Sequence, residues 1–202
     1  ATLAGSGFLG TDIVTDSPTN NFATWNAEDK GLNDLILSEG NLKCTTDGTN
    51  YAVVFGTMAF SSGKYYWEQN PTSGNNIDLA GVATTALDPD KRGSNLGASV
   101  NSVGYYGYGG AIYWNDALHA DGLATYTAGD VIGIAADMDN KKVYFYKNNT
   151  LIYTASHNAN GNITNTWKDM VPAWSIGSGV NAKSSVTNFG QDSSFAGQET
   201  AQ

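Results

Sequence analysis

Short runs of alternating apolar and polar residues, separated by turn-forming residues, recur along most of this chain, and helical spacing is almost absent. In the run from Val143 to Tyr146, Val143 and Phe145 should face a core and the two tyrosines should face the other way. Strands that arrive every ~8–12 residues between such turns are typical of two packed antiparallel sheets. The pattern therefore predicts an all-β, two-sheet antiparallel sandwich.

Turn residues and face patterns place several of the strands. Leu35–Leu37 and Leu42–Cys44 read as a hairpin whose turn uses Gly40 or Asn41 at a positive φ. In the run 64–69, Tyr65 and Trp67 should share one face, with Tyr66 and Glu68 on the other. The run 131–136 is apolar on both faces, which predicts a central strand.

The length of 202 residues fits a single all-β domain. Residues 1–30 are predicted to be an irregular N-terminal arm, residues 31–196 the sandwich, and residues 197–202 an exit tail. Pro71–Asn76 and Asp88–Asn95 are expected to be loops, because polar and turn-forming residues crowd both.

Charged residues make up only 14% of the chain, and the net charge is −9. An acidic surface repels phosphates, so we expect no nucleic-acid partner and no attraction to an anionic membrane. No run approaches the ~20 apolar residues of a membrane span, so no membrane insertion is expected. Asn, Thr, Ser and Gly supply the polarity instead, a style frequent on extracellular and virion surfaces.

Candidate chemistry is sparse. Cys44, the single cysteine, lies in a strand-like run and is interpreted as a small core residue. The two histidines are isolated, and the aspartates of the 137–140 turn lack the spacing of a calcium loop. Gly5–Gly10 matches a dinucleotide-binding pattern but has no βαβ context. We therefore predict a non-enzyme with no catalytic residue, metal or cofactor; a carbohydrate-active enzyme with two facing carboxyls stays as an alternative.

Aromatic residues interleaved with glycines between positions 105 and 114 are the sharpest feature of the sequence. Tyrosine and tryptophan suit binding surfaces, since they combine a large apolar body, a polar tip and little side-chain entropy. The candidate binding residues are Tyr106, Tyr108, Trp114 and Trp174, with core packing as the alternative, and Asp88, Lys91 and Arg92 of the 88–95 loop, with a solvated loop as the alternative.

Several blocks, taken together and in order, resemble the SPRY domain family; they lie at 62–68, 81–83, 96–97, 105–108, 129–134, 143–148, 171–173 and 188–190, with Phe195 after them. The resemblance covers about residues 50–196. Asn149 departs from it, since the family usually has glycine there, but asparagine also tolerates a left-handed turn. The resemblance implies a bent, jelly-roll-like sandwich that binds partners through loops at one edge and has no catalytic residues.

The segments 16–24 and 188–197 resemble SPRY-type modules of bacteriophage and marine viral structural proteins. We therefore expect a binding or structural module of a phage virion, in a tail fibre or a capsid decoration, at the extracellular virion surface. Its partners would be a protein or glycan on a host surface or neighbouring virion proteins, with homo-oligomers possible. The alternative is a cellular, cytoplasmic module that binds a short peptide.

Overall fold

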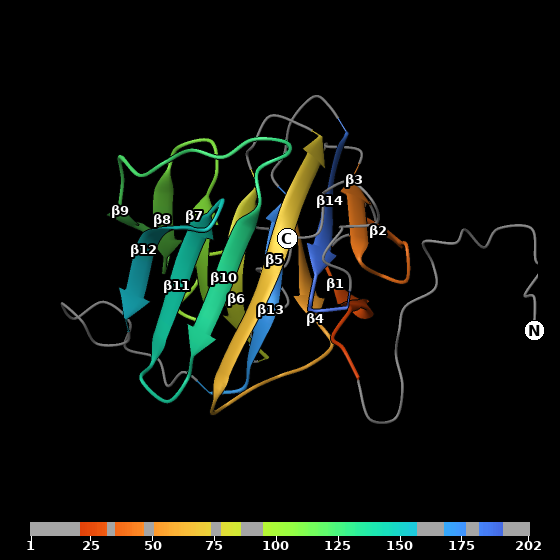
Figure 1. Cartoon of the computed structure of the whole chain (residues 1–202), viewed down its shortest axis with the longest axis horizontal. Helices are drawn as coiled ribbons and strands as arrows, with labels where there is room; N and C mark the ends of the chain where they lie inside the picture. The colour runs from red at the N-terminus through yellow and green to blue at the C-terminus, as the bar shows by residue number, and fades with distance from the viewer. Residues whose placement is uncertain are drawn as a thin grey trace, which may run out of the picture.

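The computed structural model describes residues 21–31, 35–46, 51–73, 78–85, 95–156, 168–176 and 182–191. Two antiparallel sheets of seven strands lie face to face (Figure 1). The predicted all-β sandwich is confirmed.

The first sheet has the strand order β1-β4-β13-β6-β7-β8-β9. Its strands are β1 (Trp25–Lys30), β4 (Ala52–Gly56), β6 (Leu79–Thr84), β7 (Ser102–Tyr106), β8 (Ala111–Trp114), β9 (Ala117–Ala120) and β13 (Met170–Ile176). The second sheet has the order β12-β11-β10-β5-β14-β3-β2. Its strands are β2 (Leu35–Ser38), β3 (Lys43–Thr46), β5 (Lys64–Ser73), β10 (Ile132–Asp137), β11 (Lys142–Lys147), β12 (Thr150–Ser156) and β14 (Lys183–Asn188).

The main core lies between the sheets. Val143 and Phe145 are fully buried in it, as the alternation predicted, while Tyr144 and Tyr146 are only half-buried. Interior strand β10 pairs with both β5 and β11, which confirms its central place. Cys44 is also fully buried, and burial raises the pKa of its thiol to about 12, so the nucleophilic thiolate is disfavoured.

A second, smaller apolar layer covers the outer face of the first sheet. Val53 and Phe55 point into this layer, whereas their neighbour Val54 points into the main core. Leu96, from the segment before β7, is buried against the layer. A Cβ on Gly104 would lie 2.8 Å from the Leu96 carbonyl oxygen, so glycine lets this segment rest directly on the sheet.

Two hairpin turns confirm the reading of the turn residues. Glu39, Gly40 and Asn41 join β2 to β3, with φ values of 54°, 64° and 63°. Asn148 and Asn149 join β11 to β12 at φ 47° and 63°. Two consecutive left-handed residues are the conformation of a type I′ turn, so Asn149 replaces the usual glycine without loss of the hairpin.

Two local expectations were wrong, and one strand was missed. The arm predicted for 1–30 is too long, because residues 25–30 form β1 at the edge of the first sheet, with fully buried Trp25 at the first position. The loop predicted from Pro71 starts too early, because β5 continues to Ser73 and Pro71 lies opposite Ser185. Strand β9 was not expected. Residues 1–20 and the predicted tail 197–202 lie outside the described residues.

Candidate functional site

Four chain segments of the first sheet meet at one end of the sandwich. The strand register places the start of β4 beside the end of β13, with Ile176 opposite Ala52. It also places the start of β6 beside the end of β7, with Leu79 opposite Tyr106. We call this the loop end, because β4 and β6 begin there and β7 and β13 end there.

A hollow of about 220 Å³ opens at the loop end, on the outer face of the first sheet. We call it the tyrosine pocket; it is lined by Tyr51, Leu79, Asn95, Leu96, Gly97, Ala98, Tyr106, Tyr113 and Asp116. The ring of Tyr106 packs edge-on against that of Tyr113, with centroids 6.0 Å apart. Its other neighbour is Tyr108, at 6.3 Å. Tyr51, Tyr106 and Tyr113 thus line the opening, and Tyr108 lies beside it against Tyr106.

Tyr106 and Tyr108 present different amounts of surface. Tyr106 is half-buried, and burial, followed by the neighbouring Tyr51 and Tyr113, raises the pKa of its phenol, which therefore stays a neutral donor. The side chain of Tyr108 is 66% exposed. An exposed ring beside a half-buried one is suited to cover an apolar group that enters the pocket.

Backbone contacts fix the floor and rim of the tyrosine pocket. Gly97 donates its N–H to Ser102 Oγ at 2.9 Å and accepts the Asp116 N–H at 2.9 Å. Its φ is +89°, and a Cβ there would lie 2.5 Å from the Tyr113 carbonyl oxygen. Only glycine fits this position, so the rim is held against the β8–β9 hairpin.

The two tryptophan candidates, Trp114 and Trp174, are core residues. Trp174 is fully buried between the sheets, and Trp114 is 5% exposed, with its Nε1 donating to the Val100 carbonyl at 3.1 Å. A buried ring has no face for a ligand, so the packing alternative holds for both and their proposed surface role was wrong. Asp88, Lys91 and Arg92 lie outside the described residues, and their role stays a prediction.

Tyr51 and Tyr113 belong to the tyrosine pocket but were not among the candidates. Alternation could have found Tyr113, because it must face outward on β8 once Trp114 faces the core. Tyr51 gave no such signal, since it precedes β4 and reaches the pocket through sheet pairing distant in sequence.

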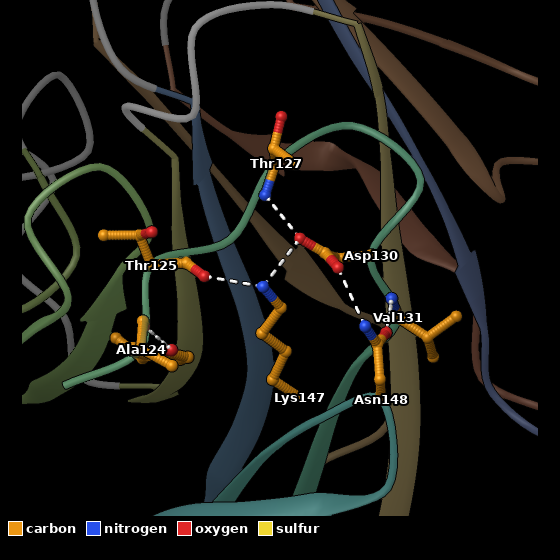
Figure 2. A network of polar contacts seen from close by, with 8 residues as sticks. Ala124, Thr125, Thr127, Asp130, Val131, Lys147 and Asn148 are labelled. Carbon is orange, nitrogen blue, oxygen red and sulfur yellow. Dashed lines mark hydrogen bonds and ion pairs between the residues drawn. The ribbon is translucent and has the colours of Figure 1, made fainter.

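A polar network fixes the 121–131 connection at the loop end (Figure 2). Asp130 accepts the Thr127 N–H and an Asn148 Nδ2–H, each at 2.8 Å, and pairs with Lys147 at 3.1 Å. Burial opposes ionisation of Asp130, but these hydrogen bonds and the ammonium outweigh it and lower the pKa of the carboxyl. Lys147 also donates to the Thr125 carbonyl at 2.8 Å, which ties the connection to the end of β11.

Tyr126, on the same connection, is fully buried and donates its hydroxyl to the Asp78 carbonyl at 2.7 Å. Asp78 directly precedes β6, so the connection is anchored to both sheets. The 121–131 connection is therefore preorganised, and a ligand that contacts it would not have to order it.

The carboxylate of Glu68, on β5, is held by hydrogen bonds. Glu68, the strand glutamate, accepts a hydrogen bond from the Tyr66 hydroxyl at 2.9 Å and another from Asn188 Nδ2 at 3.2 Å. No cluster of three or more His, Cys, Asp or Glu side chains suited to a metal ion occurs among the described residues. The described residues contain no helix that is long and apolar enough to cross a membrane.

Comparison with known proteins supplies the family. A sequence profile of the SPRY domain matches residues 64–192 of this chain. The chain belongs to the SPRY domain family. SPRY domains are, in general, non-catalytic modules that bind protein partners. The resemblance predicts a binding surface built by loops at one edge of the sandwich, and which edge carries it stays a prediction.

Solved SPRY structures share the fold at low sequence identity. The SPRY domain of human HERC1 superimposes with a TM-score of 0.68 at 17% identity, covering 83% of this chain and 99% of that one. A human SPRY domain gives 0.62 at 12% identity, covering 79% and 97%. The TRIM65 PSpry domain gives 0.61 at 14% identity, covering 82% and 92%. A search of curated protein sequences gave no significant match.

Proposed function

We propose that this SPRY domain is a non-catalytic interaction module that holds a short peptide segment of a partner protein at the tyrosine pocket. The observation that carries the proposal is the half-buried ring of Tyr106, which lines the pocket with half-buried Tyr113 and contacts exposed Tyr108 on its other side. A hollow of about 220 Å³ holds one or two side chains, not a whole small-molecule substrate.

Rigidity favours this use of the tyrosine pocket. Its rim is held by Gly97 and its floor by the second apolar layer. Tyrosines on a fixed support lose little side-chain entropy when a ligand binds, and they offer both an apolar face and a hydroxyl. A peptide side chain buried there, with its backbone along Tyr108, uses both properties.

The test is a random peptide library displayed on phage and panned against the full chain, followed by affinity measurements on the selected peptides. Tyr106→Ala and Tyr108→Ala should each weaken binding about tenfold, which corresponds to about 1.4 kcal/mol. Leu151→Ala is the matched control, because Leu151 is also half exposed but lies on β12 of the other sheet. Peptides bound equally well by all three variants, each shown to be folded, would place the interaction elsewhere.

The virion role is a second proposal, and it rests on composition and on the resemblance of segments 16–24 and 188–197 to phage structural modules. A low charged fraction of 14% with many polar, uncharged residues suits a host-facing or virion-facing surface in contact with proteins or glycans. A virion module works in many ordered copies, so light scattering at high concentration should detect self-association. A monomer under all conditions argues for the cellular peptide-binding role instead.

A further inference from the structure

A second apolar groove lies at the end of the sandwich opposite the loop end. Residues that follow β4 and residues at the start of β5 line this groove. The tyrosine pocket is instead lined by Tyr51, which precedes β4. Its volume is about 470 Å³, and its walls are formed by Asn21, Phe22, Ala23, Met58, Ala59, Phe60, Tyr65, Tyr66, Trp67, Pro172 and Phe189. We call it the β5-edge groove.

The groove runs beside a stretch of strand with a free edge. Strand β14 covers one edge of β5, but this pairing stops where Asn188 lies opposite Glu68. Figure 1 shows β14 ending partway along β5. No described strand pairs with that edge of Lys64–Trp67, although the opposite edge is paired with β10. A free edge offers backbone N–H and C=O groups for pairing with another chain.

Local geometry turns the chain away at this point. The Gly190 N–H donates to Asn188 Oδ1 at 2.8 Å, and Gly190 takes a φ of +110°. Gln191 Nε2 then donates to the Ala23 carbonyl at 3.2 Å. Strand β14 therefore ends in a fixed turn, and its pairing with β5 does not reach Lys64–Trp67.

The two faces of β5 give the free edge a distinct chemistry on each side. On the inner side, Tyr65 stacks on Phe60 with centroids 4.5 Å apart, and Met58 is 37% exposed, so an apolar side chain is favoured. On the outer side, Tyr66 is half exposed. A Cβ on Gly133 would lie 2.6 Å from Tyr66 Oη, so the tyrosine lies on the backbone of β10.

Glu68 adds charge to that outer side. Its two hydrogen-bond donors, Tyr66 and Asn188, are neutral, and within the described ranges no Lys or Arg lies within ion-pair distance of it. A carboxylate next to an exposed aromatic ring favours a cationic side chain, and arginine above lysine, because guanidinium stacks on rings and pairs with carboxylates in two-point fashion.

We propose that the free edge of β5 at Lys64–Trp67 receives an extended segment of a partner protein, in which apolar residues alternate with arginine. The segment continues the sheet beyond the end of β14. Its apolar side chains enter the β5-edge groove, and its arginine lies over Tyr66 and beside Glu68. This mode of recognition, the addition of a strand, draws affinity from backbone pairing and specificity from alternate side chains.

The experiment uses synthetic eight-residue peptides in which arginine alternates with valine, leucine or phenylalanine, added to the isotope-labelled full chain and followed by amide chemical shifts. The shifts should move at Tyr65–Trp67, Met58 and Phe189. N-methylation of one alternate set of peptide residues should abolish binding, and methylation of the other set should leave it within about twofold, because a strand pairs through every second residue.

Protein variants supply the second readout. Met58→Lys should weaken binding at least tenfold by filling the groove with a like charge, and Glu68→Gln should weaken it about threefold to tenfold. Peptides with glutamate in place of arginine should fail to bind. Tyr108→Ala is the control and should have no effect, so failure at this edge is distinguishable from failure of the tyrosine pocket.

Four results would overturn the proposal. One is the absence of binding for every arginine peptide at millimolar concentration. Another is equal loss from both methylated sets, or shifts confined to the loop end. The last is binding that appears only after Phe8→Asp, which changes an apolar residue of the predicted N-terminal arm, or after Phe195→Asp, since a segment of this chain would then be the occupant of the edge.

Discussion

Two glycines with almost the same φ differ in what would surround an added side chain. Gly97 has a φ of +89° and Gly129 a φ of +88°. An added Cβ would lie 2.5 Å from the Tyr113 carbonyl oxygen at Gly97, but would meet nothing within 4 Å at Gly129. Both positions thus need a residue that tolerates a positive φ. Only Gly97, at the tyrosine pocket, must also leave room for a neighbouring backbone atom.

Gly129→Ala should therefore cost about 1–2 kcal/mol of unfolding free energy, which is the strain of a left-handed alanine. Gly97→Ala carries the same strain plus overpacking of about 1–3 kcal/mol. Thermal unfolding should show the difference as a Tm several degrees lower for Gly97→Ala. Equal Tm values for the two variants would show that the rim of the pocket moves to make room.

The tryptophans show where residue-level prediction reached its limit. Val143, Phe145 and Cys44 were placed correctly, because alternation and a polar surface fixed the direction of each side chain. Trp174 lies on a strand buried on both faces, where the second apolar layer covers the outer side, so alternation carried no information about exposure. Which strands are covered on their outer side depends on contacts that are distant in sequence.

At the scale of elements, the turns were more predictable than the strand ends. Gly40, Asn41 and Asn149 have positive φ values that their residue types favour, whereas Glu39 takes one that its type does not. The charged segment 25–30 gave no alternating pattern, yet it pairs with β4, because Trp25 is buried and hydrogen-bonds through Nε1 to Thr187 of the opposite sheet at 3.0 Å. One tertiary contact outweighed the local signal.

The network around Asp130 makes the 121–131 connection sensitive to acid. The pKa of the Asp130 carboxyl is lower in the folded chain than in the unfolded chain. Its stabilising effect is therefore complete above the unfolded pKa of about 3.9, and it is lost as the pH falls through the lower pKa of the folded chain. Asp130→Asn should be less stable than the parent chain by about 1 kcal/mol at pH 7.

Thermal unfolding between pH 7 and pH 2 checks this prediction. The Tm difference between the parent chain and Asp130→Asn should shrink below about pH 4. Asp121→Asn, at an exposed residue that takes no part in the network of Figure 2, controls for the loss of one negative charge. A difference that stays constant down to pH 2 would contradict a role for the ionised carboxylate.

At the scale of the whole molecule, the two candidate surfaces lie at opposite ends of the same strands. Tyr51 precedes β4 at the tyrosine pocket, and Met58 follows it at the β5-edge groove. Partners at the two ends would not compete for the same residues. The proposals are therefore independent, and a chain altered at one end remains a valid control for the other.

The position of β14 also governs how the molecule can be made. The last described strand in the chain lies between β5 and β3, so β2 and β3 join the rest of their sheet only through it. A chain emerging from a ribosome cannot close this sheet until residues 183–188 are free. Until then the facing edges of β3 and β5 are open to wrong pairings, and the late, long-range insertion should make folding slow.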